Sequence, residues 1–249
     1  MNIFAISDLH LSFSVPDKSM EFFGPSWKDY QKKIEINWKN TISKDDLVLI
    51  PGDISWAMKL KDALIDLEWL NNLSGKKIII KGNHDYWWPS KTKLQKALPP
   101  SISFIQNDAI NFDDISIASA RLHDTKEFNF NEYINFVKNP RAKKALEEDI
   151  QKDLSEKLFA REIERLKLSL EKLNKNAKTK IVMTHYPPIS ATLKDSKVSK
   201  LLEENKIDKC VFGHLHNLKE NVKMFGEKNN VKYILASADY INFTPIKIL

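Results

Sequence analysis

The chain has 249 residues, of which 42% are hydrophobic and 29% are charged, as in ordinary globular proteins. It contains no apolar run of about 18 residues or more, so no transmembrane helix and no membrane partner are expected. Cys210 is the single cysteine, so an internal disulfide framework is excluded. It lies in an apolar run, which predicts a buried thiol.

The positive charge of the chain comes mainly from lysine. The formal net charge is +6, and the arginines are Arg121, Arg141, Arg161 and Arg165. The lysines are interleaved with acidic residues, which is typical of a solvated surface. Because bidentate recognition of phosphate favours arginine, nucleic acid remains a candidate partner but is not the favoured one.

The first half of the chain alternates strands with helices. Apolar stripes predict helices at about 27–40 and 60–70. Apolar runs predict strands at 3–6, 47–50, 78–80 and 115–118. This alternation is typical of an α/β protein with a mostly parallel sheet.

The pattern changes after Asp124. Residues 141–173 carry a strong helical stripe, which predicts either one long helix or two with a break near 158–161. The aromatic segment 128–137 either covers the functional site as a lid or packs on the outside of the sheet. The whole helical region, at about 125–176, is interpreted as an insertion in one domain that spans 1–249.

The last part of the chain returns to strands. Strands are predicted at 180–183, 209–212 and 233–236. Segments 234–238 and 244–248 are expected to form a closing hairpin. No linker, repeat or signal peptide is recognised, so a cytoplasmic location is expected.

Five short polar clusters each follow one of the apolar runs. They are Asp8-Leu9-His10, Gly52-Asp53, Gly82-Asn83-His84-Asp85, Thr184-His185-Tyr186 and Gly213-His214-Leu215-His216. Residues two apart in an extended chain point to the same side, so Asp8 and His10 are expected to reach one metal ion. Gly213 is expected to permit a tight turn into the last cluster.

The residue types in these clusters indicate a cationic metal centre. Asp53 can bridge two metals because a carboxylate has two oxygens, and Asn83 offers an oxygen without charge. Two divalent ions held by two aspartates leave a positive site that suits phosphate and lowers the pKa of a bridging water. Mixed His, Asp and Asn ligation favours Mn, with Fe or Zn as alternatives, over Ca or Mg.

Taken in this order, the clusters resemble the calcineurin-like metallophosphoesterase superfamily from Asp8 to His216. The resemblance implies a four-layer αββα sandwich of two mixed sheets flanked by helices. It implies two metal sites that share one carboxylate, the first formed by Asp8, His10, Asp53 and His216 and the second by Asp53, Asn83, His185 and His214. It also implies that His84 is the general acid or transition-state stabiliser and that Asp85 orients the His84 ring.

The sequence departs from the serine/threonine phosphatases of that superfamily. Those enzymes carry Asp-Arg-Gly soon after the Gly-Asp cluster, whereas Ile54-Ser55-Trp56-Ala57-Met58 follows Asp53 here. They also carry Gly-Asn-His-Glu where this chain has Gly-Asn-His-Asp. The chain is more similar to a bacterial branch of small predicted phosphohydrolases, on the stretches that begin at Gly52 and Gly82.

Three further residues are candidates for binding substrate. Arg121 follows a predicted strand and could supply a guanidinium for phosphate, or could be a surface arginine. His123 could relay a proton or contact substrate, and the alternative is a solvated loop histidine. Trp56 follows a ligand loop and could wall the substrate pocket, or could belong to the core.

The resulting prediction is a dinuclear-metal phosphoesterase that hydrolyses phosphate mono- or diesters by in-line attack of a metal-bound hydroxide. Its expected partner is a small phosphorylated substrate. One alternative is a nuclease, which the basic charge favours, although the chain has little beyond the catalytic core. The other is a non-catalytic metal-binding scaffold, which the presence of His84 and all seven ligands disfavours.

Overall fold

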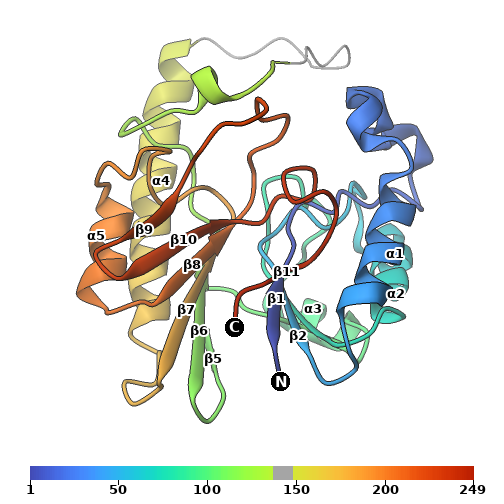
Figure 1. Ribbon diagram of the computed structural model, residues 1–249, viewed down its shortest axis with the longest axis horizontal. Coiled ribbons are helices and arrows are strands. Elements are labelled where there is room, and N and C mark those ends of the chain that lie inside the picture. Colours follow the sequence, from blue (N-terminus) through green and yellow to red (C-terminus); the bar gives the residue numbers. More distant parts are fainter. Residues whose placement is uncertain (137–147) are drawn as a thin grey trace.

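A computed structural model of the protein describes residues 1–136 and 148–249. It contains two β-sheets that face each other, with helices on both outer faces (Figure 1). The first sheet has the strand order β11-β1-β2-β3-β4. These strands are β11 (Ile246–Lys247), β1 (Ile3–Ala5), β2 (Leu47–Ile50), β3 (Lys76–Ile79) and β4 (Ile102–Phe104). β1 to β4 are parallel, and β11 runs antiparallel to β1.

The second sheet has the strand order β5-β6-β7-β8-β10-β9. Its strands are β5 (Ala109–Asn111), β6 (Ile115–Ala120), β7 (Thr179–Thr184), β8 (Lys209–Phe212), β10 (Val231–Leu235) and β9 (Gly226–Lys228). The four inner strands are parallel, and the two edge strands are antiparallel to their neighbours. Both sheets are therefore mixed.

The helices cover the two outer faces. The first sheet is covered by α1 (Tyr30–Thr41), α2 (Leu60–Asn71) and α3 (Lys91–Ala97), and the second by α4 (Glu148–Leu170) and α5 (Lys197–Glu204). Short 3-10 helices occur at Pro16–Lys18, Met20–Phe23, Pro25–Trp27 and Asn131–Tyr133. α1 begins later than the sequence predicts because Pro25–Trp27 forms one of these turns and Asp29 is left-handed, with φ 54°.

Three separate apolar layers hold the sandwich together. Between α1, α2 and the first sheet lie Trp38, Leu67 and Val48, all fully buried. The layer between the sheets is aliphatic, as Leu49 and Met183 illustrate. A third layer packs α4 and α5 on the second sheet. Strands with apolar residues on both faces are typical of sheets that are covered on both sides, so the predicted four-layer αββα fold is confirmed.

The predicted hairpin at the end of the chain is wrong. β10 pairs with β8 and β9 in the second sheet, whereas β11 crosses over and pairs with β1 in the first sheet. The two segments thus belong to different sheets. This crossover places the carboxyl end of β10 beside the loop after β1, where Ser7 forms an isolated bridge with Ser237.

The helical region contains one uninterrupted helix over its described part, α4, without a break near 158–161. Residues 137–147 of the predicted region lie outside the described residues. The aromatic segment before them packs against the core of the second sheet, with Phe130 5.9 Å from Phe225 between ring centroids. It also lines a cavity beside His214. The packing on the second sheet agrees with one of the two interpretations, and a role as a lid stays a prediction.

None of the helices in the described part of the chain is long and apolar enough to cross a bilayer.

Candidate metal centre

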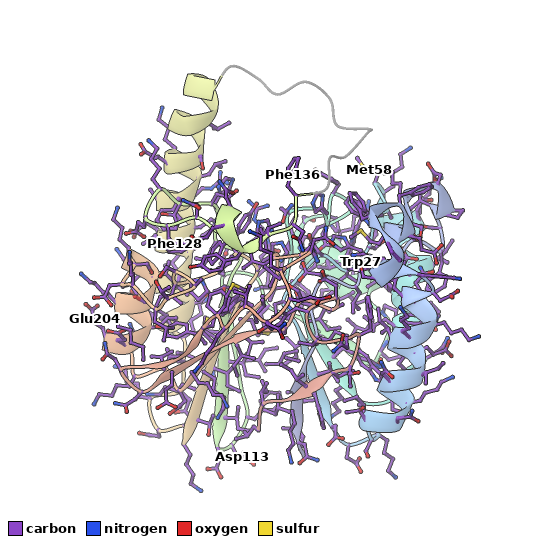
Figure 2. All side chains as sticks on the ribbon, turned by 45° about the horizontal axis from the view of Figure 1, so that its top comes forward. Trp27, Met58, Asp113, Phe128, Phe136 and Glu204 are labelled. Atoms are coloured by element: carbon purple, nitrogen blue, oxygen red, sulfur yellow. The ribbon has the colours of Figure 1, made fainter. Side chains whose placement is uncertain are left out.

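The polar clusters meet at one end of the sandwich. They follow β1, β2, β3, β7 and β8, and the carboxyl ends of parallel strands lie on the same edge of a sheet. Phe128 and Met58 lie at this end, whereas Asp113, in the turn between β5 and β6, lies at the opposite one (Figure 2). The structure thus brings together all seven residues that the sequence predicts as metal ligands.

The first group of donors consists of Asp8, His10 and His216. Their nearest donor atoms all lie within 4.8 Å of one another. The Nε2 atoms of His10 and His216 are 3.2 Å apart, and Oδ1 of Asp8 is 3.5 Å from Nε2 of His216. Asp8 and His10 are almost completely buried, so the group is well shielded from solvent.

The second group contains His185, Asn83 and His214. Oδ1 of Asn83 lies 2.6 Å from Nε2 of His185 and 3.0 Å from Nδ1 of His214. Asp8, Asp53 and His185 also form a set of donors close enough to hold one ion. The two groups therefore adjoin each other through the aspartates.

Asp53 occupies the position between the two groups. Its Oδ2 is 3.7 Å from Nε2 of His10 on one side and 3.5 Å from Nε2 of His185 on the other. Its Oδ1 accepts a hydrogen bond from the backbone N–H of His84 at 2.8 Å. Only Oδ2 is therefore turned toward both groups of donors. The sequence suggested that Asp53 would contact two metals with one oxygen each, and this geometry does not fit that arrangement.

The donor set fits divalent cations. Nδ1 of His185 donates to the carbonyl of Pro51 at 2.9 Å, and burial lowers the pKa of this ring to about 4. The ring is therefore neutral at pH 7, and the lone pair on its Nε2 faces the oxygens of Asn83 and Asp53. Lone pairs that face one another around buried carboxylates are stabilised when a cation lies among them.

Four of the candidate ligands lie in an unusual backbone conformation. Asp8, His10, Asp53 and His214 have φ of 59°, 45°, 52° and 75°. Residues other than glycine seldom occupy this region, and Asp, Asn and His do so more often than most. Asp8 and His10 therefore converge through left-handed turns after β1 has ended, and not through the alternation of an extended strand that the sequence suggested.

Two glycines are required by close contacts. A methyl group on Gly82 would overlap the carboxylate of Asp53, and one on Gly213 would overlap Asp8 and Ser7. Neither glycine has a positive φ. The expectation that Gly213 permits a tight turn is therefore corrected: the absence of a side chain, which lets a carboxylate pack against the backbone, is what matters at this position.

Asp85 does not orient the His84 ring. Its carboxylate accepts hydrogen bonds from the backbone N–H groups of Asp53 at 2.9 Å, Ile54 at 3.0 Å and Gly82 at 2.8 Å, and from Nε1 of Trp87 at 2.9 Å. These donors belong mainly to the loops that carry Asp53 and Asn83, and none of them is a nitrogen of the His84 ring. Asp85 thus holds two ligand loops together.

His84 stands beside the first group of donors. Its ring centroid is 4.5 Å from that of Trp56 and 5.6 Å from that of His10. Within the described residues its buried Nδ1 has no hydrogen-bond partner. Burial, with a smaller contribution from the nearby His185, lowers the pKa of the ring to about 4.

Two groups that orient ligands were missed by the sequence reasoning. Oδ1 of Asp239 lies 2.9 Å from Nδ1 of His216, and the hydroxyl of Tyr30 donates to the carbonyl of His10 at 2.6 Å. Asp239 follows β10, just as each polar cluster follows its own strand. This position after a strand was the only sign in the sequence that Asp239 belongs near the candidate ligands. Tyr30 lies in the apolar stripe that predicts the helix at about 27–40, and nothing in that pattern indicates a contact with His10.

The three candidate substrate residues lie in different places. Trp56 stacks on His10, with centroids 4.7 Å apart at 20°, and is half-buried. His123 stacks on Tyr186 at 5.4 Å, and Tyr186 in turn contacts His214 at 4.2 Å. Arg121 lines a separate cavity that includes none of the metal-ligand candidates.

A cavity opens beside the second group of donors. It has a volume of about 410 Å³. Its lining includes His123, Phe128, Phe130, Tyr186 and His214. Aromatic side chains next to a ligand of the metal centre form a surface against which an apolar or planar group can pack.

An αββα sandwich with His, Asp and Asn donors gathered at the carboxyl ends of its strands defines the class of metal-dependent phosphoesterases. The chain belongs to the calcineurin-like phosphoesterase family, whose model matches residues 1–218. The chain thus belongs to a family of phosphoesterases, and its structure gathers a cluster of metal-ligand candidates.

The individual proteins that resemble this chain share only part of its length or little of its sequence. The chain is 34% identical over 84 residues to the Gene 66 protein of Mycobacterium phage D29, a match that spans 34% of this chain and 40% of the phage protein. A protein of unknown function from Aquifex aeolicus has a TM-score of 0.49 and 16% identity, over 99% of this chain and 95% of that one. Phosphopantetheinyl hydrolase from Mycobacterium tuberculosis has a TM-score of 0.53 and 13% identity, over 100% and 95%, a likeness in fold.

Proposed function

We propose that the protein is a dinuclear-metal phosphoesterase that hydrolyses phosphate mono- or diesters by in-line displacement. The observation that carries this proposal is the position of Asp53, whose Oδ2 lies 3.7 Å from Nε2 of His10 and 3.5 Å from Nε2 of His185. A single carboxylate oxygen that lies between two groups of nitrogen and oxygen donors is suited to a shared ligand of two cations.

The ligands are divided between two ions in this proposal. Asp8, His10, Asp53 and His216 would hold one ion, and Asp53, Asn83, His185 and His214 would hold the other. Mixed nitrogen and oxygen donors suit Mn, with Fe or Zn as alternatives. When bound, such a pair supplies a nucleophile at neutral pH and neutralises the charge on the phosphoryl oxygens.

The side chains of the protein bind and orient the substrate. His84, beside the first group of donors, donates a hydrogen bond from its neutral ring to an oxygen of the reacting phosphate. Trp56 limits the orientation of both His84 and His10 by contact with their rings. The cavity next to His214 receives the leaving group of a small phosphorylated substrate, with Tyr186 and His123 as its wall.

The test is hydrolysis of aryl phosphate mono- and diesters by protein loaded with Mn²⁺. Asp53→Asn is expected to abolish activity and to lower the metal content below two ions per chain. His84→Gln is expected to retain the metals and to lower kcat by roughly 10²–10⁴-fold. Asp113→Asn, an exposed change at the opposite end of the sandwich, is the matched control. Equal rates for Asp53→Asn and Asp113→Asn would exclude this function.

A further inference from the structure

Three of the four arginines in the chain gather around one cavity. Arg121, Arg161 and Arg165 line a pocket of about 230 Å³, and Lys81 lines it with them. The fourth arginine, Arg141, lies outside the described residues. Such a concentration is unexpected in a chain whose positive charge is carried mainly by dispersed lysines, and it calls for an explanation other than solubility.

The pocket is built by elements that also build the metal centre. Lys81 lies between β3 and Gly82, and the carbonyl of Arg121, at the end of β6, accepts the backbone N–H groups of His185 and Tyr186, each at 3.1 Å. α4 forms the third wall, anchored on β6 by the hydroxyl of Ser169, which donates to the carbonyl of Ser119 at 2.6 Å. The pocket is therefore adjacent to the metal centre on the side of His185.

The charge in the pocket is unbalanced. Four cations and one carboxylate, that of Glu162, give its lining a formal charge of +3. Nη1 of Arg165 donates to Oε1 of Glu162 at 2.5 Å. Among the described residues, no carboxylate forms an ion pair with Lys81, Arg121 or Arg161. Several cations that converge without counter-charges favour an anionic ligand, and the planar guanidinium group suits the oxygens of phosphate.

The buried carboxylate indicates which oxyanion fits. Glu162 is 1% exposed, and its Oε2 has no hydrogen-bond partner in the part of the chain that the structure describes. A carboxylate can only accept hydrogen bonds, so the missing partner is a donor. Phosphate retains a proton near neutral pH and can supply this donor, whereas sulfate has none.

We propose that Lys81, Arg121, Arg161 and Arg165 form a phosphate-binding pocket distinct from the metal centre, and that Glu162 selects a protonated phosphate group. The phosphate is either a second phosphate group of the substrate or a free phosphate ion. The proposal does not depend on hydrolysis, because binding to the pocket can be measured whether or not the protein turns over a substrate.

The first experiment is calorimetric titration of the Mn²⁺-loaded protein with inorganic phosphate, before and after chelation of the metal. Phosphate binding that survives chelation reports the pocket. Arg161→Gln is expected to weaken this binding by roughly tenfold, as the loss of one charge-assisted hydrogen bond implies. Arg161 is an exposed residue of α4. The matched control is Lys167→Gln, which removes a charge from the same helix outside the pocket and is expected to leave binding unchanged.

A second titration tests the role of Glu162. Phosphate is expected to bind more tightly than sulfate. Glu162→Gln is expected to reduce this difference in affinity, because the glutamine amide can donate a hydrogen bond to either anion. Because Glu162 is buried, thermal unfolding is measured first to show whether Glu162→Gln folds. If this variant does not fold, the phosphate affinities of Arg161→Gln and Lys167→Gln decide whether the pocket binds phosphate. The absence of phosphate binding after chelation, or equal affinities of Arg161→Gln and Lys167→Gln, would overturn the proposal.

Kinetics identify the source of the phosphate. If the substrate supplies it, Arg161→Gln raises KM for a substrate with two phosphate groups and leaves KM for its analogue with one phosphate group unchanged. If free phosphate is the ligand, neither KM changes while the titration still shows the loss. Both results support the pocket. A protein that hydrolyses neither substrate but binds phosphate after chelation would contradict the proposed function and leave the pocket supported.

Discussion

Oδ1 of Asp239 lies 2.9 Å from Nδ1 of His216, and Oδ2 of the same carboxylate accepts the backbone N–H of Asn217 at 2.8 Å. The carboxylate thereby holds the proton of His216 on Nδ1 and turns Nε2 toward Asp8 and His10. A carboxylate behind a histidine ligand fixes both the tautomer and the orientation of the ring.

Asp239→Asn is expected to weaken metal binding by roughly 10- to 100-fold, because an amide cannot accept both of these hydrogen bonds. The measurement is a competition titration of Mn²⁺ against a chelator. Asp113→Asn, at the far end of the sandwich, is the control and is expected to bind Mn²⁺ as the unaltered protein does. Equal affinities of the two variants would show that Asp239 has no orienting role.

Gly82→Ala is expected to displace the carboxylate of Asp53, since the added methyl group would overlap it. We expect this variant to lose about 1–3 kcal/mol of unfolding free energy, as overpacked sites do, and most of its bound metal. Gly226→Ala is the matched control: its φ of 141° makes alanine unfavourable, but the nearest atom to the added methyl is 4.0 Å away, in Leu193. Chemical denaturation and metal analysis separate the two effects, and full metal content in Gly82→Ala would contradict the prediction.

Asp85→Asn is expected to lower both stability and metal affinity. The carboxylate accepts from the backbone of Asp53, Ile54 and Gly82, and an amide leaves some of these buried donors unsatisfied, at about 1–3 kcal/mol. Trp87→Phe removes only the indole donor and is expected to cost stability without loss of metal. If Asp85→Asn lowered kcat alone, with stability and metal content intact, a role in orienting His84 would be supported instead.

Cys210 is expected to resist alkylation in the folded protein. The thiol is fully buried, and burial raises its pKa to about 12. At pH 8 only about one thiol in 10⁴ is then ionised, and the thiolate is the reactive form. Because the thiol of the unfolded chain ionises near pH 9, its contribution to stability is complete below pH 9 and is lost as the pH rises toward 12.

The measurement is the rate of iodoacetamide labelling at pH 8, with and without denaturant. One equivalent should react in the unfolded chain and almost none in the folded protein. Cys210→Ala serves as the blank. Rapid labelling under native conditions would show that the thiol is accessible.

Much of the fold was predictable from local patterns. The strand predicted at 47–50 is β2, Leu47–Ile50, because a short apolar run in an alternating chain has few other interpretations. The hairpin predicted at 234–248 failed because β11 pairs with β1, more than 240 residues earlier. Pairings between strands so distant in the chain leave no local signal, since either edge of either sheet would accept the same short apolar segment.

The sequence by itself determined which side chains could bind metal and at which strand ends they would stand, because parallel strands with apolar runs deliver the following residues to one edge. Only the tertiary structure decided how they are aimed. The left-handed backbone at Asp8 and Asp53, the Asp85 carboxylate that joins two loops, and the Asp239 contact with His216 depend on neighbours distant in the chain. Residue types and spacing specify chemistry, whereas orientation is set by contacts that exist only after folding.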